Sequence, residues 1–159
     1  MRSSAFVVVF GVLASLTNAA TYYRGDTRGP KALKAAEGFK ARGFTNPEGT
    51  LFEHVEGTLK HPMRDPFIST TSDESYAKEH NGKGYVYSID EITDKIHDVA
   101  KEYEKAGKKY GHAKEKEFAV EHHIPFKAIK KAQKYNETEK KWKDVKMPAK
   151  RDIEMLFSA

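Results

Sequence analysis

The chain contains no cysteine, and this absence excludes several classes of protein at once. Disulfide frameworks, iron–sulfur clusters, cysteine-ligated zinc sites and thiol nucleophiles all need cysteine, so any catalysis must use oxygen or nitrogen groups. The seven histidines lack the HExxH spacing of a zinc enzyme. Neither a GxSxG nucleophile elbow nor a Walker phosphate loop occurs. We therefore expect no metal, and none of the commonest hydrolase or nucleotide-triphosphatase chemistries.

Long apolar runs are scarce as well, and the clearest one lies at the N-terminus. Arg2 gives a short positive start, an apolar run from Ala5 to Leu16 follows, and small residues come next. The run is short for a membrane span, and this order is typical of a secretory signal peptide cleaved after Ala19 or Ala20. We expect residues 1–19 to be removed and the mature protein to be secreted, with its action inside a host cell.

The composition of the remaining chain is typical of one globular domain. The full chain has 159 residues, of which 38% are hydrophobic and 32% charged, and its formal net charge is +5. This size and balance supply one modest core, but not two domains or a disordered protein. We expect residues 20–159 to form a single domain with a lysine-rich C-terminal tail from about residue 131.

Short strands and short helices are expected to alternate along the mature chain. Four segments that are rich in β-branched or aromatic residues, or that alternate polar and apolar residues, predict strands: 22–24, 67–71, 85–89 and 115–120. Four segments with helical spacing or helix-favouring residues predict helices: 31–37, 50–60, 73–78 and 91–105. Residues 126–134 fit either a short helix or a turn followed by a strand. This mixture predicts an α+β fold.

Glu115 and Glu117 are the strongest candidates for chemistry. They stand two residues apart on an expected strand, so both side chains point to the same face. Repulsion within such a pair raises one carboxyl pKa, and the other carboxylate can stabilise a developing cation. The alternative is a solvated charged strand, because glutamate and lysine are abundant in this chain.

Four further residues carry weaker signals. Arg24, beside Gly25 at the end of the first strand, could hold a phosphate through two parallel N–H donors. Ser69 and Thr70 could orient a carboxylate, and His54 could donate a hydrogen bond to a substrate. Each also has an ordinary explanation, as a surface arginine, edge-strand hydroxyls or a helix-surface histidine.

Taken in order, these segments resemble the ADP-ribosyltransferase toxins of the heat-labile enterotoxin and cholera toxin A-chain type. The first similar motifs are Tyr-Arg-Gly-Asp-Thr-Arg-Gly-Pro at 23–30, Gly-Phe-Lys-Ala-Arg-Gly at 38–43 and His-Val-Glu-Gly-Thr at 54–58. The Ser-Thr-Ser strand of the family is matched at 69–71 with threonine in third place. Glu-Lys-Glu at 115–117 is followed by Ile-Pro-Phe-Lys-Ala-Ile at 124–129, and the whole resemblance spans about residues 22–130.

The resemblance implies a single α+β domain with mixed β-sheets around an NAD cleft and short flanking helices. It implies that Glu117 binds the ribose 2′-hydroxyl and stabilises the oxocarbenium ion as nicotinamide leaves. Ser69 would orient Glu117, Glu115 would deprotonate or orient the acceptor, and His54 would assist. Arg24 would hold the phosphates of NAD. The other residues implied in NAD binding are Gly25, Asp26, Arg42, Ser69 and Thr70.

The resemblance also implies an acceptor and a form of the protein. In this family a Glu-x-Glu pair goes with arginine acceptors, whereas Gln-x-Glu goes with asparagine or nucleic-acid bases. We therefore expect ADP-ribose transfer to an arginine of a host protein, without an obligatory nucleic acid. Because there is no cysteine, we expect a monomer without a disulfide-linked second chain, similar to free-standing secreted fungal enzymes.

Two other functions stay open from the residues alone. Residues 127–151 hold ten lysines or arginines against three acidic residues, with Tyr135 and Trp142 among them. Such a segment can bind nucleic acid or an anionic surface without turnover, or it can be a solvated helical tail. A secreted ribonuclease could instead combine His54, Glu117 and an arginine. A requirement for NAD would distinguish the transferase from both.

Overall fold

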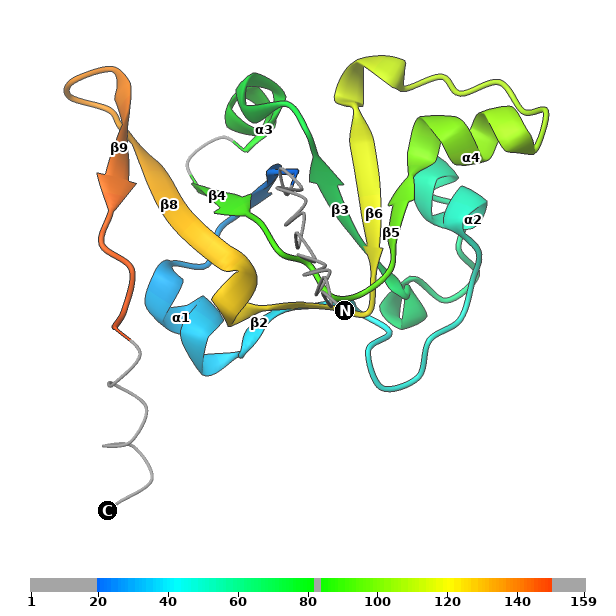
Figure 1. The fold of residues 1–159 in the computed structure, drawn as a ribbon, viewed down its shortest axis with the longest axis horizontal. Helices are drawn as coiled ribbons and strands as arrows, with labels where there is room; N and C mark the ends of the chain where they lie inside the picture. Colours follow the sequence, from blue (N-terminus) through cyan, green and yellow to red (C-terminus); the bar gives the residue numbers. More distant parts are fainter. Residues whose placement is uncertain (1–19, 82–83, 150–159) are drawn as a thin grey trace, which may run out of the picture.

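The computed structural model describes residues 20–81 and 84–149 (Figure 1). The expected signal peptide and the last ten residues lie outside this part of the chain. Within it, no helix is long and apolar enough to cross a membrane.

Seven strands form one sheet in the order β5-β6-β3-β1-β4-β8-β9, and every neighbouring pair is antiparallel. These strands are β1 (Tyr22–Asp26), β3 (Phe67–Thr71), β4 (Tyr85–Ile89), β5 (Ile96–Asp98), β6 (Glu117–Glu121), β8 (Ile129–Asn136) and β9 (Lys141–Val145). A second, two-stranded sheet pairs β2 (Gly38–Lys40) with β7 (His123–Pro125). The expected α+β fold of sheets with short helices is confirmed.

The helices are short and lie around the sheet (Figure 1). They are α1 (Pro30–Ala35), α2 (Leu51–Glu56), α3 (Glu74–His80) and α4 (Val99–Lys105), with 3-10 turns at Pro62–Arg64, Ala113–Glu115 and Phe126–Ala128. Helix α3 packs on β1 and β3 at the centre of the sheet, whereas α4 packs on β5 and β6. The centre of the sheet is therefore flanked by a helix whose side chains can line a site there.

The central strand β1 is paired along its length with β4 but at one residue pair only with β3. Five residue pairs, from Tyr22 with Ile89 to Asp26 with Tyr85, link it to β4. A single pair, Tyr23 with Thr71, links it to β3. Beyond that pair no backbone register joins the two strands, and the Arg24 side chain of β1 instead donates to the Ser69 carbonyl of β3.

Helix α2 is held in place at both of its ends. The Thr50 hydroxyl accepts from the Glu53 N–H, and the Glu53 carboxylate accepts from the Thr50 N–H at 2.8 Å, which together form a capping box. Gly57 ends the helix in the left-handed conformation. Leu51 packs in a small core with α4 and β6, and Phe52 contacts the Tyr103 ring at 4.9 Å. This short helix therefore presents its remaining face in a fixed orientation.

Residues 91–105 differ from the single helix that their spacing predicts. The helix begins only at Val99, with the Asp98 carboxylate accepting from the Lys101 N–H at its start. Residues 96–98 form β5, which pairs with β6. An apolar spacing of three or four residues is compatible with a strand followed directly by a helix, and strand pairing decides the outcome here.

The lysine-rich segment also differs from the expected helical tail. The strands β8 and β9 form a hairpin that joins the main sheet through pairing of β8 with β4. Of the two possibilities for residues 126–134, the turn followed by a strand is correct. Gly38, which follows the helix predicted at 31–37, begins β2 with a φ of 119°.

Candidate active site

Two adjoining hollows lie where β1 and β3 separate. The first, which we call the glutamate pocket, has a volume of about 220 Å³ and is lined by β1, β3, α3 and the start of β6. The second, the arginine pocket, has a volume of about 300 Å³ and extends toward β2 and α2. Arg24 and Ser69 line both pockets. The two hollows are therefore compartments of one cleft with a shared wall.

Most of the residues singled out from the sequence meet in this cleft. The glutamate pocket contains Arg24, Gly25, Ser69, Thr70, Glu115 and Glu117. The arginine pocket adds His54 and Arg42. Asp26 lines neither pocket, because its carboxylate is paired with the Arg28 guanidinium at 2.8 Å. Its place in the fold is that of a structural partner for Arg28.

Arg24 is held by a hydrogen bond and an aromatic ring, and it lines both pockets. Its Nη1 donates to the Ser69 carbonyl oxygen at 2.5 Å, and its guanidinium lies 5.4 Å from the centre of the Phe39 ring. Its Nε is buried without a hydrogen-bond partner. Burial lowers the pKa of Arg24 below its usual range, and the positive charges of Arg28 and Arg42 act in the same direction. An anionic ligand in the pockets that Arg24 lines would offset this crowding of positive charge.

Glu117 is a buried carboxylate, with 9% of the residue exposed. Its Oε1 lies 3.7 Å from His54 Nε2. The other ring nitrogen of His54 is 2.7 Å from Asp65 Oδ2. Burial opposes the charged form of His54, but hydrogen bonds to Asp65 and Glu117 outweigh it and raise the pKa of His54 to about 9. At neutral pH an imidazolium therefore stands between two carboxylates.

The pKa of His54 has a consequence for stability. A histidine whose pKa is higher in the folded than in the unfolded protein stabilises the fold fully below its unfolded pKa, near 6.5. This contribution is lost as the pH rises through about 9. In the folded protein His54 is therefore charged over the neutral range and faces both Asp65 and Glu117.

Ser69 contacts His54 rather than Glu117 directly. Its Oγ lies 2.9 Å from His54 Nε2, the nitrogen that also faces Glu117. The resemblance implies that the serine orients the glutamate. In this structure the imidazole of His54 lies between the two side chains and connects them.

Glu115 reaches the pocket by a different route from the one its spacing predicts. It ends a 3-10 turn, Lys116 follows in the left-handed conformation with a φ of 45°, and β6 begins only at Glu117. The alternation of a strand therefore does not apply, yet both carboxylates line the glutamate pocket. The buried Thr71 hydroxyl donates to the Glu115 carbonyl at 2.7 Å and accepts from the Asp73 N–H at 2.9 Å. This threonine, in third place of the serine–threonine strand, holds the turn.

Comparison with known proteins now defines the family. The family model described as Scabin-like matches residues 22–148. The chain belongs to the Scabin-like family. No curated protein matches it.

Solved structures show the same fold as this Scabin-like chain. One, named guanine-specific ADP-ribosyltransferase, is 26% identical with a TM-score of 0.60, over 79% of this chain and 72% of that one. The Scabin toxin from Streptomyces scabies in complex with NADH is 24% identical with a TM-score of 0.62, over 82% and 74%. The protein named EcPltA is 22% identical with a TM-score of 0.55, over 82% and 85%. The expected ADP-ribosyltransferase fold is confirmed, whereas the narrower enterotoxin type stays a prediction.

Two tyrosines whose pKa values respond to the glutamates of the cleft are not marked by any sequence motif. Burial and then the charge of Glu115 raise the pKa of Tyr76, which lines the glutamate pocket from α3. Burial and then the charges of Glu117 and Glu115 raise the pKa of Tyr110. Tyr110 lies in an irregular loop before the glutamates, and no motif marks it. Asp65 was missed for the same reason, since only the fold brings it to His54.

One lysine pair and one aromatic pair of the β8–β9 hairpin lie on opposite faces. In the β8–β9 register, Lys134 faces Lys143 and Tyr135 faces Trp142. Because successive residues of a strand point to opposite faces, the lysine pair and the aromatic pair lie on opposite sides of the hairpin. Lys131 is moreover paired with Asp144 at 2.9 Å. These two cross-strand pairs therefore do not interleave basic and aromatic side chains on one face.

The Thr71 hydroxyl gives a test of how the turn is held. We expect Thr71→Val to lower the free energy of unfolding by about 1–3 kcal/mol, because it leaves the Glu115 carbonyl and the Asp73 N–H without their partner. Urea unfolding measures this difference. Ser75→Ala, at an exposed position on α3, is the control and should change the value by less than about 0.5 kcal/mol. Equal values for the two variants would show that the hydroxyl does not hold the turn.

Proposed function

We propose that this Scabin-like chain is a secreted mono-ADP-ribosyltransferase toxin that uses NAD and releases nicotinamide. One observation carries the proposal: the buried Glu117 carboxylate is ion-paired with His54 in the cleft that also contains Arg24 and Ser69. The family match supports it, as do a relative named as an ADP-ribosyltransferase and the Scabin complex with NADH. The signal-peptide pattern at residues 1–19 supports secretion.

The chemistry of the cleft fits NAD. The guanidinium of Arg24 lines both pockets, and Lys40 and Arg42 line the arginine pocket beside it. These cations would hold the pyrophosphate of NAD. The glutamate pocket, with Glu117 on its wall, would then receive the ribose that carries nicotinamide.

The reaction breaks the bond between the anomeric carbon of that ribose and the nicotinamide nitrogen. The bonding electrons leave with nicotinamide, and positive charge develops on the ribose. A buried carboxylate lowers the activation free energy of this step, because the positive charge that it stabilises is present only in the transition state. A nucleophile of the acceptor then forms the new bond to the anomeric carbon, and its proton passes to a base. Glu115, at the same pocket, is the carboxylate positioned for that step.

The proposed acceptor is an arginine side chain of a host protein. The Glu115 side chain is about one third exposed (34%), so it can meet a large acceptor at the mouth of the pocket. A carboxylate both binds a guanidinium and can take the proton that its nitrogen must lose before attack. Guanine is the second candidate, because one relative is named guanine-specific. A guanine edge also presents N–H donors that a carboxylate can accept.

The test is nicotinamide release and product analysis with purified mature protein. A soluble guanidino compound and a guanine-containing oligonucleotide are offered in parallel with NAD. Labelled ADP-ribose on the guanidino compound supports arginine, and label on the oligonucleotide supports guanine instead. RNA cleavage without NAD would support the ribonuclease, and no turnover of NAD would overturn the proposal.

Glu115→Gln should separate the two half-reactions. Glutamine keeps the size of the side chain but neither carries charge nor takes a proton. We expect transfer to the guanidino compound to fall about 100-fold, while NAD hydrolysis without acceptor stays within about threefold of wild type. An equal loss in both assays would show that Glu115 acts on NAD and not on the acceptor.

A further inference from the structure

The cleft contains one buried acid that the reaction itself does not use. Asp65 lies just before β3, with 9% of the residue exposed. Its Oδ2 faces His54 Nδ1 at 2.7 Å, and its Oδ1 accepts from the Phe67 N–H at 2.9 Å. Its carbonyl accepts from the Gly43 N–H at 2.7 Å. The carboxylate is therefore fixed through both of its oxygens and through its own backbone.

This arrangement decides where the protons of His54 lie. An ionised carboxylate only accepts hydrogen bonds, so Nδ1 carries a proton toward Asp65. Nε2 then faces Ser69 Oγ at 2.9 Å and Glu117 Oε1 at 3.7 Å. When Nε2 is also protonated, it donates to the serine and places a positive charge beside the buried glutamate. The serine hydroxyl is then free to donate its own hydrogen elsewhere in the cleft.

We propose that Asp65 is a positioning residue, which holds the His54 imidazolium in place beside the Glu117 carboxylate of the cleft. A buried carboxylate keeps its charge only with a partner, and His54 is that partner for Glu117. The catalytic meaning of this inference rests on the proposed function, because it makes Asp65 act on the reaction through His54 and Glu117.

The charged groups around His54 explain why the charge of its imidazole depends on Asp65. Glu117 on β6 faces the imidazole from one side and Asp65 from the other. The remaining charged groups that line the same pocket are cationic: Arg24 on β1, Arg42, and Lys40 on β2, which is itself paired with the Glu37 carboxylate at 2.8 Å. The Phe67 ring, 5.4 Å from the imidazole, excludes water from one side. With Asp65 neutral, the Glu117 carboxylate alone would stabilise the imidazolium of His54, whose charge burial disfavours.

Asp65→Asn tests the proposal without changing the size of the side chain. In the wild type, His54 stays charged across the neutral range. In the variant, we expect the pKa of His54 to fall by at least one unit, into the range of pH 6 to 8. NAD hydrolysis by the variant should then fall about tenfold from pH 6 to pH 8 relative to wild type, as the imidazolium is lost.

Two controls separate this effect from a merely structural one. Asp94→Asn removes a carboxylate that accepts from the His123 N–H on a different part of the molecule, and its pH profile should follow wild type. In a His54→Gln background, Asp65→Asn should change hydrolysis by less than about twofold at any pH, because its route of action is already gone. Thermal unfolding of each variant establishes that it is folded.

Proton NMR titration of the histidine ring signals gives a readout that needs no substrate. The His54 signal is identified by its absence from the His54→Gln spectrum. A fall of its pKa in Asp65→Asn supports the proposal. An unchanged pKa, or a loss of activity that is equal at pH 6 and pH 8, overturns it. If the protein proves inactive with NAD, the proposed function fails, while the titration still tests the pairing of Asp65 with His54.

Discussion

Glu117→Gln should reduce NAD hydrolysis and ADP-ribose transfer together by about 10²–10³-fold in kcat, while the KM for NAD stays within about threefold. Glutamine has the shape of glutamate without its charge. It therefore cannot stabilise the cation that develops on the ribose, whereas contacts to the ground state are kept. Steady-state nicotinamide release over a range of NAD concentrations measures both constants.

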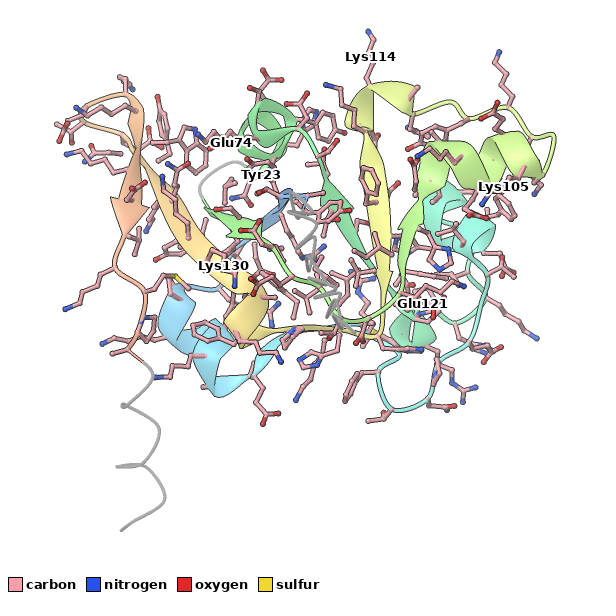
Figure 2. All side chains as sticks on the ribbon, viewed as in Figure 1. Tyr23, Glu74, Lys105, Lys114, Glu121 and Lys130 are labelled. Carbon is pink, nitrogen blue, oxygen red and sulfur yellow. The ribbon has the colours of Figure 1, made fainter. Side chains whose placement is uncertain are left out.

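Glu121→Gln is the matched control for this expectation. Glu121 lies on the same strand, β6, and its carboxylate is also hydrogen-bonded to a histidine, His97, at 2.7 Å. It is labelled in Figure 2, at the end of β6 away from Lys114. It lines neither pocket of the cleft, so kcat should stay near the wild-type value. An equal loss in both variants would show that any β6 glutamate supports the fold, and that Glu117 has no special part in the chemistry.

The parts of the fold that follow from local chemistry could be predicted from the sequence. The strand predicted at residues 67–71 has the bounds of β3, and the helix predicted at 73–78 forms as α3 with Asp73 as its N-cap. Both depend on residues that act within a few positions: β-branched side chains after a proline, and an N-cap aspartate. The ordered motifs added the family-level fold, which no single segment shows.

The parts that depend on distant pairing could not be predicted. Residues 96–98 become a strand because β6 lies beside them, and β8 becomes a strand because β4 lies beside it. The same limit applies to the site. Eleven positions separate His54 from Asp65, and only the folded chain shows that the two side chains meet. The two glutamates share a pocket as expected, but a left-handed residue between them, and not strand alternation, brings them there.

Gly38→Ala should be the most destabilising of the changes considered. Gly38 has a φ of 119°, and a Cβ there would lie 2.1 Å from the Ile124 carbonyl oxygen of the paired strand β7. Backbone strain and this clash add, so we expect a loss of about 3 kcal/mol or more in the free energy of unfolding. For a domain of this size that corresponds to roughly 10 °C in the melting temperature, measured by calorimetry.

The same change should weaken the active site from a distance. Gly38 begins β2, and the next residue, Phe39, is buried against Tyr87 and under the Arg24 guanidinium. A shift of β2 away from β7 would therefore move the support of Arg24, and the KM for NAD should rise. Gly107→Ala is the control, because Gly107 also has a positive φ, 63°, nothing lies within 4 Å of its Cβ position, and it lines neither pocket of the cleft. We expect that variant to lose only about 1 kcal/mol and to keep its KM. If the two variants melt at the same temperature, the close approach of β2 and β7 does not limit stability, and the strain of the backbone alone accounts for both.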